Sequence, residues 1–185
     1  MMMTKSKIYN LIFIVFIGAL LYPPIGTPIK VFIKRAISFS PSVIDANERN
    51  SLDDYNWQLK NMKGEDYNFN SAKNKVVLVN LWATWCPDCI AEMPSLQALY
   101  NDYSQKVEFL FVTNDSKEKV EAFMSKKGFN FPVYNESSKI PSILYSRSIP
   151  ATYLISKKGE IVISKINAAN WNSDTVRNTI DELLN

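Results

Sequence analysis

The chain of 185 residues is long enough for one ordinary domain and a short additional segment. Its composition, with 46% hydrophobic and 21% charged residues, is that of a folded protein and excludes bulk disorder. The net charge of +3 comes from the first 40 residues, which hold five cations and no acid. Residues 41–185 carry 16 basic and 18 acidic residues, a balance of −2, so nothing in the charge indicates nucleic-acid binding.

Two residue types limit the chemistry that the chain can perform. It contains no histidine, which excludes Ser–His and Cys–His nucleophiles and His-ligated metal centres. Its two cysteines, Cys86 and Cys89, are separated by two residues, so they cannot form a long-range disulfide framework. We therefore expect the cysteines to act as a local pair, and we expect no metal and no cofactor.

The N-terminal region begins with an apolar run at residues 8–22, which follows two lysines and contains one Asn. No charge occurs from residue 8 to residue 29, and as a helix these residues would reach about 33 Å, enough for a hydrocarbon core of ~30 Å. Three prolines and a glycine disfavour a regular helix beyond Tyr22. We interpret residues 1–29 as an uncleaved membrane anchor, with a cleaved signal peptide as the alternative.

Residues 30–56 are interpreted as a basic juxtamembrane segment and linker. Plotted as a helix, the first of them place apolar side chains such as Phe32 on one side and Lys30 and Lys34 on another. Two interpretations stay open, a helix on an anionic membrane surface and a solvated basic linker. Residues 41–55 are polar and predict a tether. Because cations lie on both sides of the apolar run, charge alone does not orient the protein in a membrane.

Residues 57–185 predict a mixed α/β domain. Apolar runs predict buried strands, three- and four-residue spacing predicts helices, and Lys-Gly pairs predict hairpin turns. The expected elements are a hairpin at 57–59 and 66–69, strands at 76–83, 107–113 and 131–134, helices at 89–103, 116–127 and 174–184, and a hairpin at 151–155 and 161–165. This order indicates a central sheet flanked by helices. We expect Gly128 to end the second helix and Ser173 or Asp174 to cap the third.

The cysteine pair stands where a buried strand gives way to a helix. Unpaired N–H groups and the helix dipole favour negative charge at that end, which favours the thiolate of Cys86. Pro87 suits a first helical turn because its missing N–H is not needed there. Cys89 lies one turn further in. We therefore expect Cys86 to attack a disulfide and Cys89 to resolve the mixed disulfide that results.

Other uses of such a pair can be compared with this one. Haem attachment requires His after the second cysteine, where this chain has Ile90, and a four-ligand zinc site requires two further Cys or His. A copper site made of two thiolates and a purely structural pair stay open. Neither explains why Trp82 and Trp85 come just before the cysteines.

The stretch VVLVNLWATWCPDCIAEMP at residues 76–94 resembles the active-site region of thioredoxin-like proteins, in particular the membrane-tethered bacterial reductases of the TlpA/ResA type. Further matches are Pro94 at a helix kink, Ile149-Pro150-Ala151-Thr152 as a cis-proline loop and Lys158-Gly159 at a hairpin turn. The resemblance covers residues 57–184. It implies a thioredoxin-like fold with an N-terminal hairpin addition, a periplasmic location, and reduction of disulfides in exported proteins such as apocytochromes c.

The resemblance also implies roles near the cysteines. Glu92, three residues after Cys89, would handle the proton of that buried thiol. Its alternative role is to complement the positive end of the helix. Asn80 stands where cytosolic thioredoxins carry a buried Asp, and its amide cannot titrate. Asp88 replaces a commoner proline, and its charge disfavours the thiolate of Cys86.

Pro150 is expected in the cis form, which for an X–Pro bond costs only ~0.5–1 kcal/mol. Similar proteins use this bond to hold a backbone edge that an extended substrate can join. The alternative is an ordinary trans proline at an edge strand. We expect Trp85, Pro87, Ile149 and Pro150 to bind substrate, and Trp82 to pack inside.

The resulting hypothesis is a thiol–disulfide oxidoreductase that reduces disulfides in exported proteins. It would be anchored in the cytoplasmic membrane of a bacterial cell envelope, with the catalytic domain in the periplasm, and a membrane electron donor would recharge it. Two alternatives remain, a disulfide oxidase or isomerase on the same fold and a non-enzymatic copper-binding module.

Overall fold

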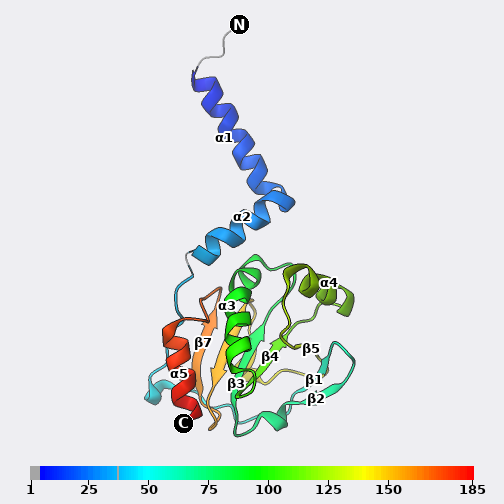
Figure 1. Ribbon diagram of the computed structural model, residues 1–185, viewed down its shortest axis with the longest axis vertical. Helices are drawn as coiled ribbons and strands as arrows, with labels where there is room; N and C mark the ends of the chain where they lie inside the picture. The colour runs from blue at the N-terminus through cyan, green and yellow to red at the C-terminus, as the bar shows by residue number, and fades with distance from the viewer. Residues whose placement is uncertain (1–4, 37) are drawn as a thin grey trace.

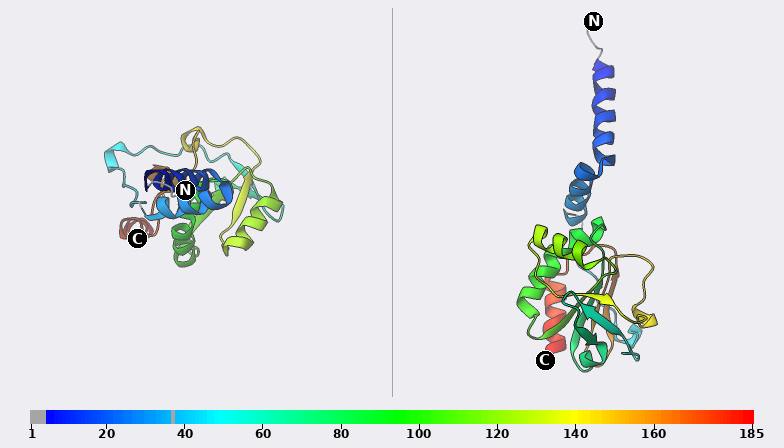
Figure 2. Two further views of the ribbon diagram at one scale, coloured as in Figure 1. Left: turned by 90° about the horizontal axis from the view of Figure 1, so that it is seen from above. Right: turned by 90° about the vertical axis from the view of Figure 1, so that its right-hand side faces the viewer.

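The computed structural model describes residues 5–36 and 38–185. Two helices at the N-terminus, α1 (Lys5–Leu21) and α2 (Pro23–Ala36), precede a domain that contains all the strands. Helix α1 projects away from this domain, and α2 lies between α1 and the domain (Figure 1 and Figure 2). The cysteine pair belongs to the domain, at the end that faces α2.

The domain is built on a seven-stranded mixed sheet with the order β2-β1-β5-β4-β3-β6-β7. Strand β3 pairs in parallel with β4 and antiparallel with β6, and β1 and β2 form an added hairpin that joins the sheet through β5. The strands are β1 (Gln58–Asn61), β2 (Asp66–Asn68), β3 (Val76–Leu81), β4 (Val107–Val112), β5 (Val133–Glu136), β6 (Ala151–Ile155) and β7 (Ile161–Ile166). The prediction of a thioredoxin-like α/β fold with a central mixed sheet is confirmed.

Alternate residues of β3 face opposite sides of the sheet, as the pleat requires. Val76 and Leu78 join a hydrophobic cluster with residues of three helices, α3 (Pro87–Tyr103), α4 (Lys117–Lys127) and α5 (Asp174–Leu184). Val77 and Val79 join a second cluster on the other side. Because both faces are covered, β3 is apolar along nearly its whole length.

The second cluster is closed by the segment before the sheet and by two short 3₁₀ helices, which contribute Phe69, Ala72 and Leu144. Leu52 and Tyr55 are buried in it. The N–H of Ile44 donates to the carbonyl of Val162 over 2.8 Å, and the N–H of Leu52 donates to that of Gly159 over 2.8 Å. The prediction of a free tether over residues 41–55 is therefore wrong, because a few apolar residues in a polar segment fix it to the domain. The 3₁₀ helices are η1 (Ala46–Glu48), η2 (Phe69–Ala72) and η3 (Ser142–Leu144).

Gly159 in the β6–β7 turn is required by its surroundings. Its φ of +84° is a left-handed conformation, and an added Cβ would lie 3.0 Å from the hydroxyl of Tyr55 and 3.1 Å from the carbonyl oxygen of Leu52. The turn predicted at Lys158-Gly159 is thus confirmed. It is also the point where the N-terminal segment meets the sheet.

The predicted helix ends are confirmed by their caps. Gly128 has φ +71° and its N–H donates to the carbonyl of Met124, which closes α4. The hydroxyl of Ser173 accepts from the N–H of Val176 at the start of α5.

Helicity continues past Tyr22, contrary to our expectation, because α2 begins anew at Pro23. A proline is tolerated in a first turn, where no intrahelical N–H is needed, and only Pro28 lies deeper in α2. Large apolar side chains of α1, among them Phe13 and Phe16, are exposed. In the part of the chain that the structure describes, no helix is both long and apolar enough to cross a membrane.

Candidate active site

The two cysteines lie at the start of α3 and form a disulfide, with their Cα atoms 5.2 Å apart. Cys86 is the N-cap residue of α3, and its sulfur accepts a hydrogen bond from the N–H of Cys89 over 3.1 Å. Pro87 occupies the first helical position, as expected. The helix end therefore directs an otherwise unpaired N–H at the sulfur of the first cysteine, which favours negative charge on that atom.

The two cysteines differ only slightly in exposure, because Cys86 is 4% exposed and Cys89 is fully buried. The preceding tryptophans differ much more. Trp85 is 69% exposed beside the pair, whereas Trp82 is 2% exposed and packs against Phe123 and Phe131. The expectation that Trp82 packs inside is confirmed, and Trp85, which directly precedes Cys86, is exposed.

The loop before β6 lies beside the disulfide. The Ile149–Pro150 peptide bond is cis, as expected. The sulfur of Cys86 lies 3.8 Å from the carbonyl oxygen of Ile149. The first residue of β6, Ala151, pairs with Leu81 at the end of β3, and this pairing holds the loop next to the helix start. A backbone edge thus accompanies the disulfide, with Trp85 exposed nearby.

Glu92 is buried one turn after Cys89, and its carboxylate accepts four hydrogen bonds. Asn80 Nδ2 and Thr152 Oγ1 donate to Oε1 over 2.8 and 3.4 Å. Trp171 Nε1 and the N–H of Ala169 donate to Oε2 over 3.0 and 3.3 Å. None of the hydrogen bonds that the described residues make to this carboxylate comes from Cys89. The side chain is therefore oriented by β3, β6 and the segment before α5.

Burial away from water raises the pKa of Glu92 to about 8, although its hydrogen bonds from Trp171, Asn80, Ala169 and Thr152 oppose the shift. A carboxyl group with this pKa exchanges protons near neutral pH. No other acid of the described chain combines such burial with a position one helical turn from a cysteine.

Asn80 contacts both Glu92 and Thr152, because its Nδ2 donates to Glu92 Oε1 over 2.8 Å and to Thr152 Oγ1 over 2.7 Å. Its Oδ1 is buried without a hydrogen-bond partner in the described residues. The sequence indicated that Asn80 cannot titrate but not that it contacts Glu92. Thr152 belongs to the cis-proline loop already noted, whereas the contact of Trp171 carries no local sequence signal because 79 residues separate it from Glu92.

Asp88 is not simply solvated at the mouth of the site. Its Oδ2 lies 3.1 Å from Nζ of Lys34 on α2, so the one acidic residue between the two cysteines forms an ion pair with a lysine. The Lys34 side chain is 47% exposed, so this ion pair contributes little to the stability of the fold. It does offset the repulsion that Asp88 exerts on a thiolate at Cys86.

Within residues 5–36 and 38–185, no three His, Cys, Asp or Glu side chains gather in a way that could hold a metal ion.

Comparison with known proteins agrees with this site. Residues 54–164 match the model of the AhpC/TSA family. The chain is 30% identical over 148 residues to the "Thioredoxin-like protein YneN" of Bacillus subtilis, a match over 78% of this chain and 85% of that protein. It is 34% identical over 110 residues to the "Thiol-disulfide oxidoreductase ResA" of Halalkalibacterium halodurans, over 58% of this chain and 62% of that one, slightly less than two thirds.

Among solved structures, a DsbF homologue from Corynebacterium diphtheriae is similar, with a TM-score of 0.62 and 19% identity over 78% of this chain and 93% of that chain. At this identity the likeness shows the fold alone. The family match and the identity to YneN show more: the chain belongs to the AhpC/TSA family, among its thioredoxin-like thiol–disulfide oxidoreductases of the TlpA/ResA type.

Proposed function

We propose that this protein reduces disulfide bonds in exported proteins, with Cys86 as the attacking thiolate and Cys89 as the resolving thiol. The observation that carries the proposal is the capping arrangement, in which the sulfur of Cys86 accepts the N–H of Cys89 at the start of α3. This donor and the helix dipole stabilise a thiolate at Cys86 more than one at Cys89.

Reduction of a client disulfide takes two thiol–disulfide exchange steps. The Cys86 thiolate attacks one sulfur of the client disulfide, forms a mixed disulfide and releases the other client sulfur as a thiolate. The Cys89 thiolate then attacks the Cys86 sulfur and releases the second client thiolate. Two electrons pass to the client, and the protein is left with the Cys86–Cys89 disulfide. A dithiol donor at the membrane must supply two electrons to restore the reduced pair.

Glu92 would accept the proton that Cys89 loses before it attacks. Its pKa of about 8 is close to the ~8.5 of an ordinary thiol, so proton transfer between the two groups costs little in either direction. Both side chains are buried one helical turn apart, where bulk water cannot easily take the proton.

An extended client segment would bind along the loop before β6. The backbone of Ile149 lies beside the Cys86 sulfur, and Pro150 holds that edge in place. Main-chain hydrogen bonds to such an edge hold a segment without reading its sequence. The exposed Trp85 and the half-buried Pro87 would cover the client residues around the cysteine.

The domain would work outside the cytoplasmic membrane, in the periplasm, held there by the N-terminal helices. Stable disulfides are found mainly in exported proteins. Helix α1 exposes a continuous apolar surface at residues 11–17, which lipid would cover. Helix α2, with Lys34 against Asp88, would keep the start of α3 turned toward the membrane and its electron donor.

The test is to trap clients on single-cysteine variants. Cys89→Ser leaves the attacking thiol without its resolving partner, so it should accumulate mixed disulfides with exported proteins. Cys86→Ser should accumulate almost none. Equal trapping by both variants would overturn the assignment. Tight binding of Cu⁺ to the reduced pair, without disulfide exchange, would favour the copper-binding alternative instead.

A further inference from the structure

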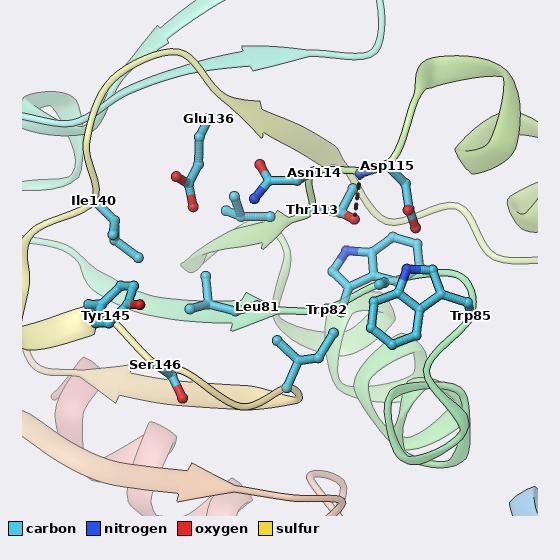
Figure 3. A pocket seen from close by; sticks show the side chains of 13 residues that line it. Leu81, Trp82, Trp85, Thr113, Asn114, Asp115, Glu136, Ile140, Tyr145 and Ser146 are labelled. Atoms are coloured by element: carbon cyan, nitrogen blue, oxygen red, sulfur yellow. Dashed lines mark hydrogen bonds between the residues drawn. The ribbon is translucent and has the colours of Figure 1, made fainter.

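A cavity of about 420 Å³ opens beside the redox pair, at the ends of β3, β4 and β5. Trp85, which precedes Cys86 in the chain, forms one side of the cavity, and Ile149, whose carbonyl lies next to the Cys86 sulfur, also lines it. Tyr145 and Ile140, from the loop between β5 and β6, form the opposite wall (Figure 3). The cavity is therefore continuous with the surface that a client would touch, but its floor and far wall take no part in the exchange reaction.

Trp82 supplies an unused hydrogen-bond donor at this cavity. Its indole is 2% exposed, and its Nε1–H has no partner in the described part of the chain. Figure 3 shows the indole nitrogen directed toward the space between Thr113 and Leu81. A buried donor without an acceptor is unfavourable, so an acceptor on a bound molecule would stabilise this nitrogen. Because Nε1 is itself buried, the indole ring must tilt slightly toward the cavity for that bond to form.

Two carboxylates border the same cavity without a cation. Asp115 Oδ2 is held by the N–H and hydroxyl of Thr84, at 2.7 and 2.8 Å, which leaves Oδ1 free of these contacts. Glu136 points toward the cavity in Figure 3, and burial raises its pKa. Within residues 5–36 and 38–185 neither acid takes part in an ion pair. None of the described residues lining the cavity is Lys or Arg.

Aromatic surface completes the lining. Trp85 and Tyr145 are both largely exposed and stand on opposite sides of the opening. Flat aromatic faces suit the methylene stem of a lysine or the guanidinium plane of an arginine, and each attracts the cationic head as well. An acidic side chain would instead meet two carboxylates of its own sign.

We propose that this cavity binds a Lys or Arg side chain of the client, located within a few residues of the cysteine under attack. The cationic head lies toward Glu136 and Asp115, the stem packs between Trp85 and Tyr145, and a carbonyl of the same segment accepts from Trp82 Nε1. This inference rests on the proposed function and adds a substrate class to it: the preferred clients are polypeptides with a basic residue near the disulfide.

The test uses full-length reduced protein and short disulfide-linked peptides that carry Lys, Gln or Glu at one position near the cysteine. The rate constant kcat/KM for disulfide reduction should be about tenfold higher for the best Lys peptide than for its Glu counterpart, a size that one partly buried charge pair can supply. Glu136→Gln should remove most of this preference, and Glu136→Lys should reverse it. Glu182→Gln, a matched change on the exposed side of α5, should leave it unchanged.

A second readout follows binding without reaction. Adding a Lys peptide with Ser in place of Cys should shift the Nε1–H resonance of Trp82 in an NMR spectrum. The Nε1–H of Trp171, already bonded to Glu92, serves as the internal control and should not move. Because this measurement needs no chemistry, it distinguishes a binding site from an effect on the cysteines.

The possible failures are distinguishable. Equal reduction of Lys, Gln and Glu peptides by the wild type, with no shift at Trp82, would overturn this inference and leave the proposed function standing. A charge preference that survives in Glu136→Lys would also overturn it. Failure to reduce any peptide would overturn the proposed function, and this inference with it.

Discussion

Replacing Glu92 by Gln should change how stability depends on pH. Burial raises the pKa of Glu92 from 4.5 to about 8. The folded protein therefore binds one more proton than the unfolded chain between these values, so the stability linked to this proton is present below pH 4.5 and is lost as pH rises toward 8. At ~1.4 kcal/mol per pH unit, the loss is about 5 kcal/mol.

The Gln variant cannot ionise, so this loss should disappear. In the variant, the NH₂ group of Gln faces N–H and O–H donors to which the carboxylate of Glu92 now offers an acceptor. Two donors cannot bond to each other, so the folded state loses about 1–3 kcal/mol of stability. Rotation of the Asn80 amide by 180° can reduce this loss, because its Oδ1, which has no hydrogen-bond partner in the described residues, would then accept from the Gln NH₂ group. The variant should accordingly be less stable than the wild type at pH 4.5 and more stable at pH 8.

The measurement is the free energy of unfolding in urea for the oxidised protein at pH 4.5, 6 and 8. Glu121→Gln, on the exposed surface of α4, is the matched control and should keep the pH dependence of the wild type. Glu136 contributes a smaller fall of the same sign in both proteins, because burial also raises its pKa. If Glu92→Gln loses as much stability as the wild type over this range, Glu92 does not carry a raised pKa.

Three further predictions concern the N-terminal helices and the proton step. The protein without its first 40 residues should fold and reduce disulfides, since the segment that closes the second hydrophobic cluster is kept; an insoluble or molten fragment in circular dichroism would contradict this. Lys34→Gln should slow iodoacetamide alkylation of Cys86 at neutral pH by about twofold, because the charge of Asp88 is no longer offset, whereas Lys30→Gln should not. The rate of disulfide reduction should be measured as a function of pH, and Glu92→Gln should slow the resolving step and make this rate less dependent on pH. If Asp88→Asn shifts the pH dependence of the rate instead, the proton-handling role belongs to Asp88.

The elements of the domain were predictable because their signals are local. The bounds of β6 and α5 agree with the sequence prediction to the residue, since turn residues or caps stand at their ends. The redox pair and the cis proline were predictable because each belongs to a short run of residues with a distinctive spacing.

The rest depends on contacts between residues far apart in the chain. Trp171 reaches Glu92, and Lys34 reaches Asp88 across 54 positions, which neither periodicity nor spacing can indicate. The segment before β1 is polar on average, so its composition predicts a tether, while a few apolar residues, Ile44, Leu52 and Tyr55, pack it against the domain. The cavity beside Trp85 likewise forms from three separate stretches of the chain, at residues 81–85, 112–115 and 136–149.

The reduction potential of the Cys86–Cys89 couple decides whether this protein donates electrons to client disulfides or withdraws them from client thiols. Equilibrating the protein with a dithiol of known potential and counting free thiols would measure it. A reductase of exported proteins requires a potential near that of thioredoxin, about −270 mV. A value near the −120 mV of a strong disulfide oxidant, about that of DsbA, would contradict the proposed direction and identify the protein as an oxidase.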